Sequence, residues 1–335
     1  MVLALYNRIH GGDDLKKRIL SLCLIFCFFI TGCSNKSAEK KEKEITIGFS
    51  QAGTESSWRK AQNKSINDEL NKQNYQVMYR NSFSDPKQQI QDVMTFIAYQ
   101  VDLIVLSPIE ENGWEPILEE AKQAKIPVII VDRNITTDRK DLYLTHIGSS
   151  FKAQGGRAGL YVTNHFQRKE QDSINVFEIK GSENTSPTRL RHDGFTETVG
   201  RDPRVKITQS ITGDFIRLKA KEVFSQAIDE GKLESIDVIY SHNDEMTLGA
   251  LEALKEHQVE NKYVIVSIDA QKEMIDLLKK RQVNCVVECN PFMGNLVANT
   301  VKRYFEKATI PEDIYVSDTV FSDHNDFSTI PPRNY

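Results

Sequence analysis

Short apolar runs alternate with amphipathic stretches along the chain from Ile45 onward. Several runs, such as those at 102–108 and 126–133, are continuous in Val, Ile and Leu instead of alternating with polar residues. Continuous apolar runs are typical of parallel strands that are covered on both faces. The predicted strands span residues 45–50, 76–81, 102–108, 126–133, 144–149, 174–181, 205–213, 237–244, 263–270 and 284–290.

The stretches between these strands carry helix signals. Asp85 provides an N-cap, Pro86 the first helical position and Gln88 the glutamine of a capping box, and apolar residues then follow with helical spacing. The other predicted helices lie at about 58–73, 114–124, 152–167, 217–230, 245–257, 272–281 and 292–307. The alternation predicts an α/β fold with doubly wound parallel sheets. Ten strands are many for one compact open sheet, so we expect two sheets.

Length and charge narrow the class of protein. At 335 residues, the chain exceeds the usual size of a single core, which favours two lobes. With 39% hydrophobic and 27% charged residues it has an ordinary globular composition. The net charge of −4 argues against a surface built for nucleic acid, because such surfaces need clustered Lys and Arg.

The N-terminal segment differs from the rest of the chain. Basic residues at 16–18 precede an apolar run at 19–30 that ends in Thr-Gly-Cys33, which is typical of an export signal. The run is shorter than the roughly 20 residues that span a bilayer, and its end resembles a lipobox in which Cys33 is acylated. We therefore expect a lipoprotein signal peptide at 1–33, a flexible tether at 34–44, and a lipid anchor on the outer face of the cytoplasmic membrane. The alternative is an uncleaved membrane anchor.

Two cysteines remain beyond the predicted signal, and we do not expect them to form a disulfide with each other or to bind a metal ion. Cys285 and Cys289 lie four positions apart in one predicted strand, so their separation is roughly 13 Å, beyond the reach of a disulfide. No cluster of further ligands accompanies them. We interpret both as buried thiols and expect no metal and no cofactor.

Polar side chains gather where the predicted strands end. Ligands bind beyond the carboxyl ends of strands in open parallel sheets. The candidate binding residues are Gln51, Trp58, Arg59, Asp132, Arg133, Arg189, Arg191, Asn243, Asp269 and Glu288. Carboxylate, amide and guanidinium groups each bind paired hydroxyls, and the apolar face of a sugar ring packs on an aromatic ring, here Trp58. Each residue alone is more often a solvated strand end, but the set together predicts a sugar site.

Signals for catalysis are weak. The segment 48–53 has one residue too many for a G-x-S-x-G nucleophile elbow. No phosphate-binding glycine motif occurs, and the glycines within 155–159 are better explained by helix packing. His242, Asp244 and Glu245 suit the N-cap and first turn of a helix better than a metal site. We therefore do not expect an enzyme.

A family resemblance is carried by five segments: GFSQAGTESSWR (48–59), GWEPILEEAKQAKIPVIIVDR (113–133), TGDFIRLKAKEV (212–223), YSHNDEMTLGALEALKE (240–256) and SIDA (267–270). The chain resembles the type I periplasmic sugar-binding proteins of the ribose/galactose kind, and within them most closely the galactofuranose-binding proteins of sugar ABC importers. This resemblance implies two Rossmann-like lobes joined by a three-segment hinge. It places the N-terminal lobe at 45–147 and 290–316, and the C-terminal lobe at 148–289 and 317–335.

The resemblance also bears on single positions. It implies that the strand-end residues above bind the sugar, and that either Arg189 or Arg191 completes the set, with a preference for Arg191. Ala270 stands where the family has a glycine after Asp269. The polar segment 322–335 extends beyond the related proteins.

The resemblance implies a monomeric substrate-binding lipoprotein that captures a monosaccharide, galactofuranose or a related hexose or pentose. Its partners would be the permease and ATPase of an ABC importer. A sugar-sensing lipoprotein that signals to a membrane histidine kinase would have the same fold and cleft, so this alternative stays open. A transcriptional repressor is disfavoured, because it needs a helix-turn-helix where this chain has a signal segment and tether.

Overall fold

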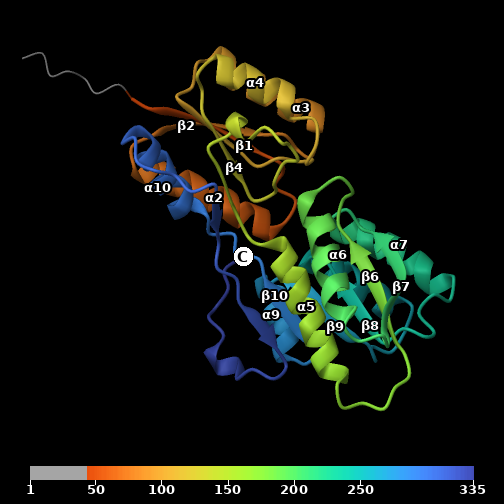
Figure 1. Ribbon diagram of the computed structural model, residues 1–335. Coiled ribbons are helices and arrows are strands. Elements are labelled where there is room, and N and C mark those ends of the chain that lie inside the picture. The colour runs from red at the N-terminus through yellow and green to blue at the C-terminus, as the bar shows by residue number, and fades with distance from the viewer. Residues whose placement is uncertain (1–43) are drawn as a thin grey trace, which may run out of the picture. The chain divides into compact units, whose positions relative to one another are not determined.

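The computed structural model describes residues 44–335. The predicted signal peptide, Cys33 and tether residues 34–43 lie outside the described residues. In the described part, the chain forms two six-stranded sheets with helices around them (Figure 1). The predicted α/β fold with two sheets is confirmed. No helix of residues 44–335 is long and apolar enough to cross a membrane.

The first sheet contains the first five strands and one late strand. It has the order β11-β5-β4-β3-β1-β2, and its pairings are parallel. Its strands are β1 (Thr46–Gln51), β2 (Gln76–Asn81), β3 (Leu103–Leu106), β4 (Val128–Val131), β5 (Thr145–Gly148) and β11 (Asp313–Tyr315). We call this sheet and the helices that pack on it the first lobe.

Helix α3 of the first lobe begins at the cap that the sequence indicates. Asp85 accepts hydrogen bonds from the backbone N–H groups of Lys87 and Gln88, and Pro86 occupies the first turn. The helices are α2 (Ser57–Lys72), α3 (Pro86–Ala98), α4 (Glu115–Gln123) and α10 (Gly294–Phe305), with a short 3-10 turn η2 (Lys140–Leu142). α10 follows the second sheet in sequence, yet it packs beside α2 (Figure 1).

The second sheet has the order β12-β10-β9-β8-β6-β7, and only the pairing of β12 with β10 is antiparallel. Its strands are β6 (Ile174–Lys180), β7 (Val205–Thr212), β8 (Val238–Ser241), β9 (Val264–Asp269), β10 (Cys285–Glu288) and β12 (Val320–Ser322). Its helices are α5 (Phe151–Phe166), α6 (Ser186–Val199), α7 (Arg217–Asp229), α8 (Asp244–Glu256) and α9 (Lys272–Lys279), with a 3-10 turn η3 (Phe327–Thr329). This sheet and its helices form the second lobe.

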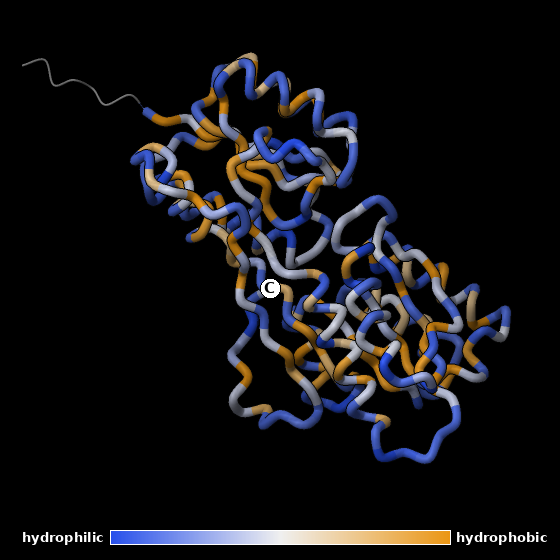
Figure 2. Tube along the Cα trace, viewed as in Figure 1, coloured by the Kyte–Doolittle hydropathy of each residue, from blue (hydrophilic) through white to orange (hydrophobic). Residues whose placement is uncertain are grey.

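The chain changes sheet three times: between β5 and β6, between β10 and β11, and between β11 and β12. The buried apolar clusters of residues 44–335, one of which includes strands of both sheets, consist of the continuous apolar strands and the inner helix faces. They appear as hydrophobic stretches of the trace in Figure 2. Cys285 and Cys289 are buried, free thiols in the second lobe, as predicted.

Apart from the two 3-10 turns, three elements of residues 44–335 were not predicted: β11, β12 and α6. β11 and β12 have three residues each and lie at sheet edges, where so few residues produce no readable pattern. The predicted helices did not include α6, in which both Arg189 and Arg191 lie. α6 packs on α5 through glycines: a Cβ at Gly155 would lie 2.1 Å from the carbonyl oxygen of Arg191, and one at Gly194 would lie 2.0 Å from that of Lys152. A helix that packs through glycine lacks the apolar stripe by which amphipathic helices are recognised.

Candidate functional site

A cavity lies between the two lobes. It is lined by Glu55, Ser56, Trp58, Arg59, Asp132, Arg133, Phe151, Pro187, Arg191, Phe215, Asn243, Asp269 and Cys289. Seven of the ten predicted binding residues are in this lining. They come from both lobes, because the carboxyl ends of both sheets face the same space.

Arg59 and Asp132 form a buried ion pair on the first-lobe side of the cavity. Arg59 lies in the first turn of α2, and Asp132 directly follows β4. The Nη1 atom of Arg59 lies 2.6 Å from Oδ2 of Asp132 and 2.9 Å from Oε1 of Gln62. Burial lowers the pKa of Arg59, but the charges of Asp132 and Glu55 outweigh it and raise the pKa above its usual value. Arg59 is therefore a fixed cation, and its Nε atom is buried without a hydrogen-bond partner.

Arg133 is a second buried cation beside the first. Its Nη1 atom donates to the carbonyl oxygen of Ile109 at 2.8 Å, and its guanidinium carbon lies 5.4 Å from the centre of the Phe215 ring. Burial and the nearby charge of Arg59 lower the pKa of Arg133 to about 10. The first lobe thus presents two guanidinium groups and one carboxylate, which can together bind neighbouring hydroxyls.

Arg191 is the main cation on the second-lobe side. Its Nε atom donates to Oε1 of Gln154 at 3.0 Å, its Nη1 atom donates to the carbonyl oxygen of His242, and Nη2 lies 3.7 Å from Oδ1 of Asp269. The guanidinium group also lies over the ring of Phe151, 5.2 Å from its centre. These contacts hold Arg191 in one orientation before a ligand arrives, which reduces the ordering cost of binding.

Asn243 links the cavity to α8. Its side-chain oxygen accepts a hydrogen bond from the backbone N–H of Met246 at 2.9 Å and so caps the helix. Its NH₂ group lies 3.3 Å from the carbonyl oxygen of Phe215. Because the amide oxygen is occupied by the cap, the NH₂ group is the part of Asn243 that can donate to a ligand.

The turn after β9 carries the second carboxylate. Burial raises the pKa of Asp269 to about 7, against the opposing charge of Arg191. Behind the turn, Asp244 accepts hydrogen bonds from Ser267 Oγ at 2.5 Å and from the backbone N–H of Gln271 at 2.7 Å. Burial and the neighbouring Asp269 raise the pKa of Asp244 well above its usual value. Asp244 therefore holds the turn in place and does not line the cavity.

Both cavity aspartates have backbone conformations that L-residues rarely adopt. The φ angle is +64° at Asp132, +131° at Asp269 and +65° at Ala270. The family resemblance implies a glycine at position 270, and glycine would adopt the left-handed φ observed at Ala270 without steric cost. Strained backbone of this kind persists where the surrounding structure holds it, and it is common at binding sites.

Trp58 closes one side of the cavity. Its side chain is almost fully buried, and its indole N–H donates to the carbonyl oxygen of Cys289 at 2.5 Å. The guanidinium group of Arg59 lies 4.9 Å from the centre of the indole ring. Burial raises the pKa of the Cys289 thiol, so this lining residue stays protonated. The indole is thus fixed in position as a flat apolar wall.

Three predicted residues lie outside the cavity lining. Gln51 donates to Gln62 at 3.2 Å, and Gln62 in turn accepts from Arg59, so Gln51 lies one side chain behind the cavity. Arg189 pairs with Glu111 at 3.0 Å. The carboxylate of Glu288 is also occupied elsewhere, because it accepts from the backbone N–H of Thr319 at 2.9 Å and lies 2.6 Å from Nη1 of Arg333.

Six lining residues were not predicted: Glu55, Ser56, Phe151, Pro187, Phe215 and Cys289. Ser56 caps α2 by accepting from the backbone N–H of Arg59, and a serine two residues before Trp58 is a recognisable cap signal. Phe151 and Phe215 reach the cavity from the start of α5 and from the loop before α7. Nothing in their local sequence separates these rings from core residues. Among residues 44–335, no three His, Cys, Asp or Glu side chains are grouped so that they could hold a metal ion.

The sequence of this chain is similar to a known protein family and to two binding proteins of known name. A family model described as "Periplasmic binding protein domain" matches residues 47–309. The chain is 34% identical over 275 residues to the galactofuranose-binding protein YtfQ of Escherichia coli (strain K12), covering 81% of this chain and 85% of that protein. It is 30% identical over 294 residues to the fructose import binding protein FruE of Bifidobacterium longum (strain NCC 2705), covering 87% and 88%.

Three solved structures are also similar. The periplasmic binding protein of the arabinose ABC transporter from Shewanella sp. ANA-3, bound to α- and β-L-arabinofuranose, has a TM-score of 0.79 at 33% identity, covering 83% of this chain and 92% of that one. A Mycobacterium smegmatis protein in complex with β-D-fucofuranose has a TM-score of 0.80 at 32% identity, covering 83% and 91%. The fructose-binding periplasmic domain of the hybrid two-component system BT1754 has a TM-score of 0.77 at 27% identity, covering 84% and 91%.

Proposed function

Because this chain belongs to the periplasmic binding protein domain family, we propose that it captures a monosaccharide between its two lobes and delivers it to an ABC importer. The observation that carries the proposal is the shared cavity, in which Arg59, Asp132, Arg191, Asn243 and Asp269 from both lobes face one space. We further propose the export route predicted above, with Cys33 lipidated and the protein anchored outside the cytoplasmic membrane.

Furanose sugars are the proposed ligand class. Similar proteins carry names or bound ligands of this class: galactofuranose, L-arabinofuranose and D-fucofuranose. The chemistry of the cavity suits such a ring, because guanidinium, carboxylate and amide groups surround a space that has an indole on one side. Hydroxyls on a sugar ring both donate and accept, so they can pair with all three kinds of group.

Binding is proposed to act through closure of the lobes. The predicted hinge crossings near residues 147, 289 and 317 would let the lobes move apart and together. A sugar that touches both lobes interacts with more groups in the closed form than in the open form. It therefore shifts the population toward the closed form.

A sensor of sugar that signals to a membrane histidine kinase is the second candidate. The similarity to the fructose-binding domain of a hybrid two-component system favours it, whereas the similarity to importer binding proteins favours transport. The genes beside this one distinguish the two. A permease and an ATPase there support the importer, and a kinase with a response regulator supports the sensor.

We expect the purified protein to bind a monosaccharide with a dissociation constant of about 1 µM or tighter, since several charge-assisted hydrogen bonds form in a buried site. Isothermal calorimetry against a panel led by equilibrium mixtures of galactose and arabinose tests this. Amino acids and inositols serve as controls. Binding of a control ligand with no response to any sugar would overturn the proposal.

We expect sugar affinity to fall as the pH drops through 7. Burial raises the pKa of Asp269 to about 7, and the ionised carboxylate accepts more hydroxyl bonds than the acid. Sugar therefore favours the ionised form, so affinity is full above about pH 8 and declines by up to about tenfold per pH unit below 7. Calorimetry from pH 5.5 to 8.5 measures this decline. The Asp269→Asn variant should bind more weakly but with a flat profile, and an equally steep profile in that variant would assign the titration to another group.

A further inference from the structure

Glu111 and Arg189 join the two lobes beside the cavity without lining it. Glu111 lies in the loop between β3 and α4 of the first lobe, and Arg189 lies in α6 of the second lobe. Nε of Arg189 donates to Oε1 of Glu111 at 3.2 Å, and Nη2 donates to Oε2 at 3.0 Å. The arginine side chain is 51% exposed, whereas that of Glu111 is only 9% exposed. Two parallel bonds to a mostly buried carboxylate form a stronger link than an ordinary surface pair.

Backbone contacts across the same rim support this pair. The N–H of Glu111 donates to the carbonyl oxygen of Asn184 at 2.8 Å, and the N–H of Asn134 donates to Oγ of Ser186 at 2.8 Å. The carbonyl oxygen of Glu111 accepts from the N–H of Thr136 at 2.6 Å, which fixes the first-lobe loop itself. The rim of the second lobe, from Asn184 to Arg189, is thus bonded to two loops of the first lobe.

These contacts lie immediately outside the cavity wall. Asn134 follows the lining residue Arg133, and Ser186 precedes the lining residue Pro187. The contacts need no ligand, since every partner is a group of this chain. Moving the lobes apart would break each of these contacts that joins the two lobes, and it would expose the carboxylate of Glu111. These contacts exist in the closed form and not in the open form. They therefore stabilise the closed form relative to the open form, whether or not sugar is bound.

We propose that the Glu111–Arg189 pair is a latch that sets how long a bound sugar stays in the cavity. This inference rests on the proposed function and deepens it. Sugar enters only the open form, in which the pair is separated, so the latch slows association only by the fraction of ligand-free protein that is closed. Sugar leaves only after the lobes part, so the full strength of the latch acts on the dissociation rate. Glu111 and Arg189 are accordingly positioning residues that act through the lobes and do not contact the ligand.

Stopped-flow displacement of the bound sugar tests the latch, with tryptophan fluorescence as the signal because Trp58 lines the cavity. We expect Arg189→Ala and Glu111→Gln each to raise the dissociation rate about five- to tenfold. The association rate should rise by a smaller factor, equal to the increase in the open fraction of the ligand-free protein. The double variant should dissociate no faster than either single variant, because both substitutions remove the same interaction.

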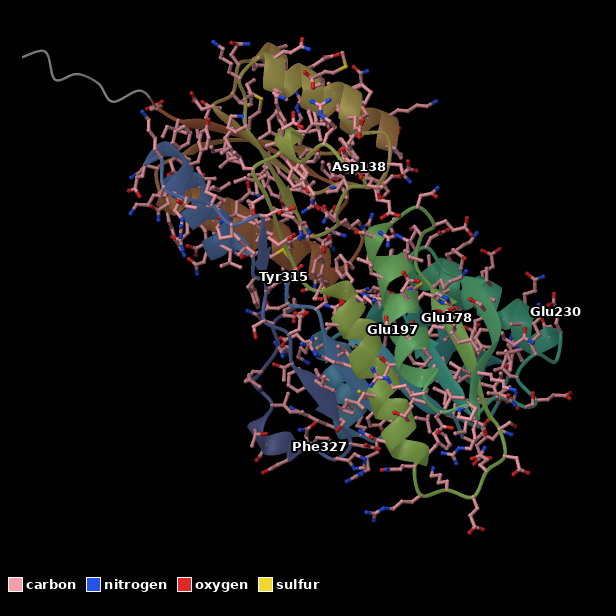
Figure 3. All side chains as sticks on the ribbon, viewed as in Figure 1. Asp138, Glu178, Glu197, Glu230, Tyr315 and Phe327 are labelled. Atoms are coloured by element: carbon pink, nitrogen blue, oxygen red, sulfur yellow. The ribbon has the colours of Figure 1, made fainter. Side chains whose placement is uncertain are left out.

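A matched control is the Lys152–Glu197 pair, whose atoms lie 2.7 Å apart on the adjacent helices α5 and α6 of the second lobe. Glu197 is labelled in Figure 3. Glu197→Gln removes an ion pair within one lobe and should leave both rates unchanged. Arg189→Ala with the wild-type dissociation rate would overturn the latch, as would an equal increase in Glu197→Gln.

Amide hydrogen exchange gives a second readout that needs no sugar. The N–H groups of Glu111 and Asn134 donate across the rim, so in the ligand-free protein we expect them to exchange faster in Arg189→Ala than in the wild type. Equal exchange in both proteins contradicts the latch. If the wild-type protein binds no sugar, the proposed function fails while the exchange experiment still decides whether the lobes are latched.

Discussion

Replacing Asp132 with alanine is expected to weaken sugar binding at least about 100-fold. The carboxylate is almost fully buried and lies 2.6 Å from Arg59 in the wall of the cavity. Its loss removes an acceptor for sugar hydroxyls and leaves a buried cation without its main partner. Breaking a buried pair costs about 3–5 kcal/mol. The carboxylate of Glu55, whose Oε1 lies 3.8 Å from Nε of Arg59, still balances part of the charge of Arg59 in this variant. We therefore expect the free energy of unfolding to fall by about 3 kcal/mol.

Two variants separate the causes of this effect. Asp132→Asn removes the charge but keeps the shape, and asparagine also tolerates the left-handed backbone of this position, so we expect an intermediate loss of about tenfold in affinity. Asp141→Ala removes an exposed carboxylate that is paired with Lys122 and Arg139 at the surface, and it should leave affinity unchanged. Calorimetry and thermal unfolding measure both quantities. Undiminished affinity in Asp132→Ala would remove this residue from the site.

Replacing Gly155 with valine is expected both to destabilise the second lobe and to weaken sugar binding. A Cβ at this position would lie 2.1 Å from the carbonyl oxygen of Arg191 and 2.8 Å from its carbonyl carbon. Both are backbone atoms of α6, so the clash is relieved only if α5 and α6 move apart. Overpacking of this kind costs about 3 kcal/mol, which corresponds to a fall in melting temperature of roughly 6–12 °C. Since the displaced residue is Arg191 itself, we also expect affinity to fall at least about tenfold.

Gly156 on the same helix is the matched control. A Cβ there would meet only Thr198 Oγ1, at 3.3 Å, and Gly194 O, at 3.7 Å. Alanine is favoured over glycine inside a helix by about 1 kcal/mol. Gly156→Ala should therefore leave the melting temperature unchanged or slightly raised, with normal sugar affinity. Differential scanning calorimetry with and without sugar measures both variants, and an unchanged melting temperature in Gly155→Val would contradict the close packing of the two helices.

Much of the fold was predictable, because continuous apolar strands and capped helices leave strong local signals. Asp85 and Pro86 marked the start of α3 correctly, and each of the ten predicted strands overlaps an observed one. The convergence of Asp132, Asn243 and Asp269 followed from a general property of parallel sheets, since residues after their strands meet at one edge. Such predictions need only local sequence and topology.

The three predicted residues that lie outside the cavity lining do so for a shared physical reason, because each is held by a partner that the local sequence does not reveal. Glu288 ends β10 as predicted, but Arg333, which follows it by 45 positions, occupies its carboxylate. Arg189 lies in the predicted region, but its orientation is set by Glu111 in the other lobe. Gln51 ends β1 with its side chain bonded to Gln62 behind the cavity. Local sequence indicates which residues lie near the site, whereas tertiary contacts decide which side chains face it.

The positive φ angles at Asp132 and Asp269 limit how sugar preference can evolve. Aspartate, asparagine and glycine tolerate the left-handed φ of Asp132, whereas only glycine adopts the φ of +131° at Asp269 without strain. Most other side chains at these positions would therefore distort the loops before they altered the contacts with a ligand. Phe151 and Pro187 instead stand in the first turns of α5 and α6, where ordinary helical backbone accepts many residues. A directed-evolution library aimed at new substrates should therefore diversify the two helix starts and keep both acids.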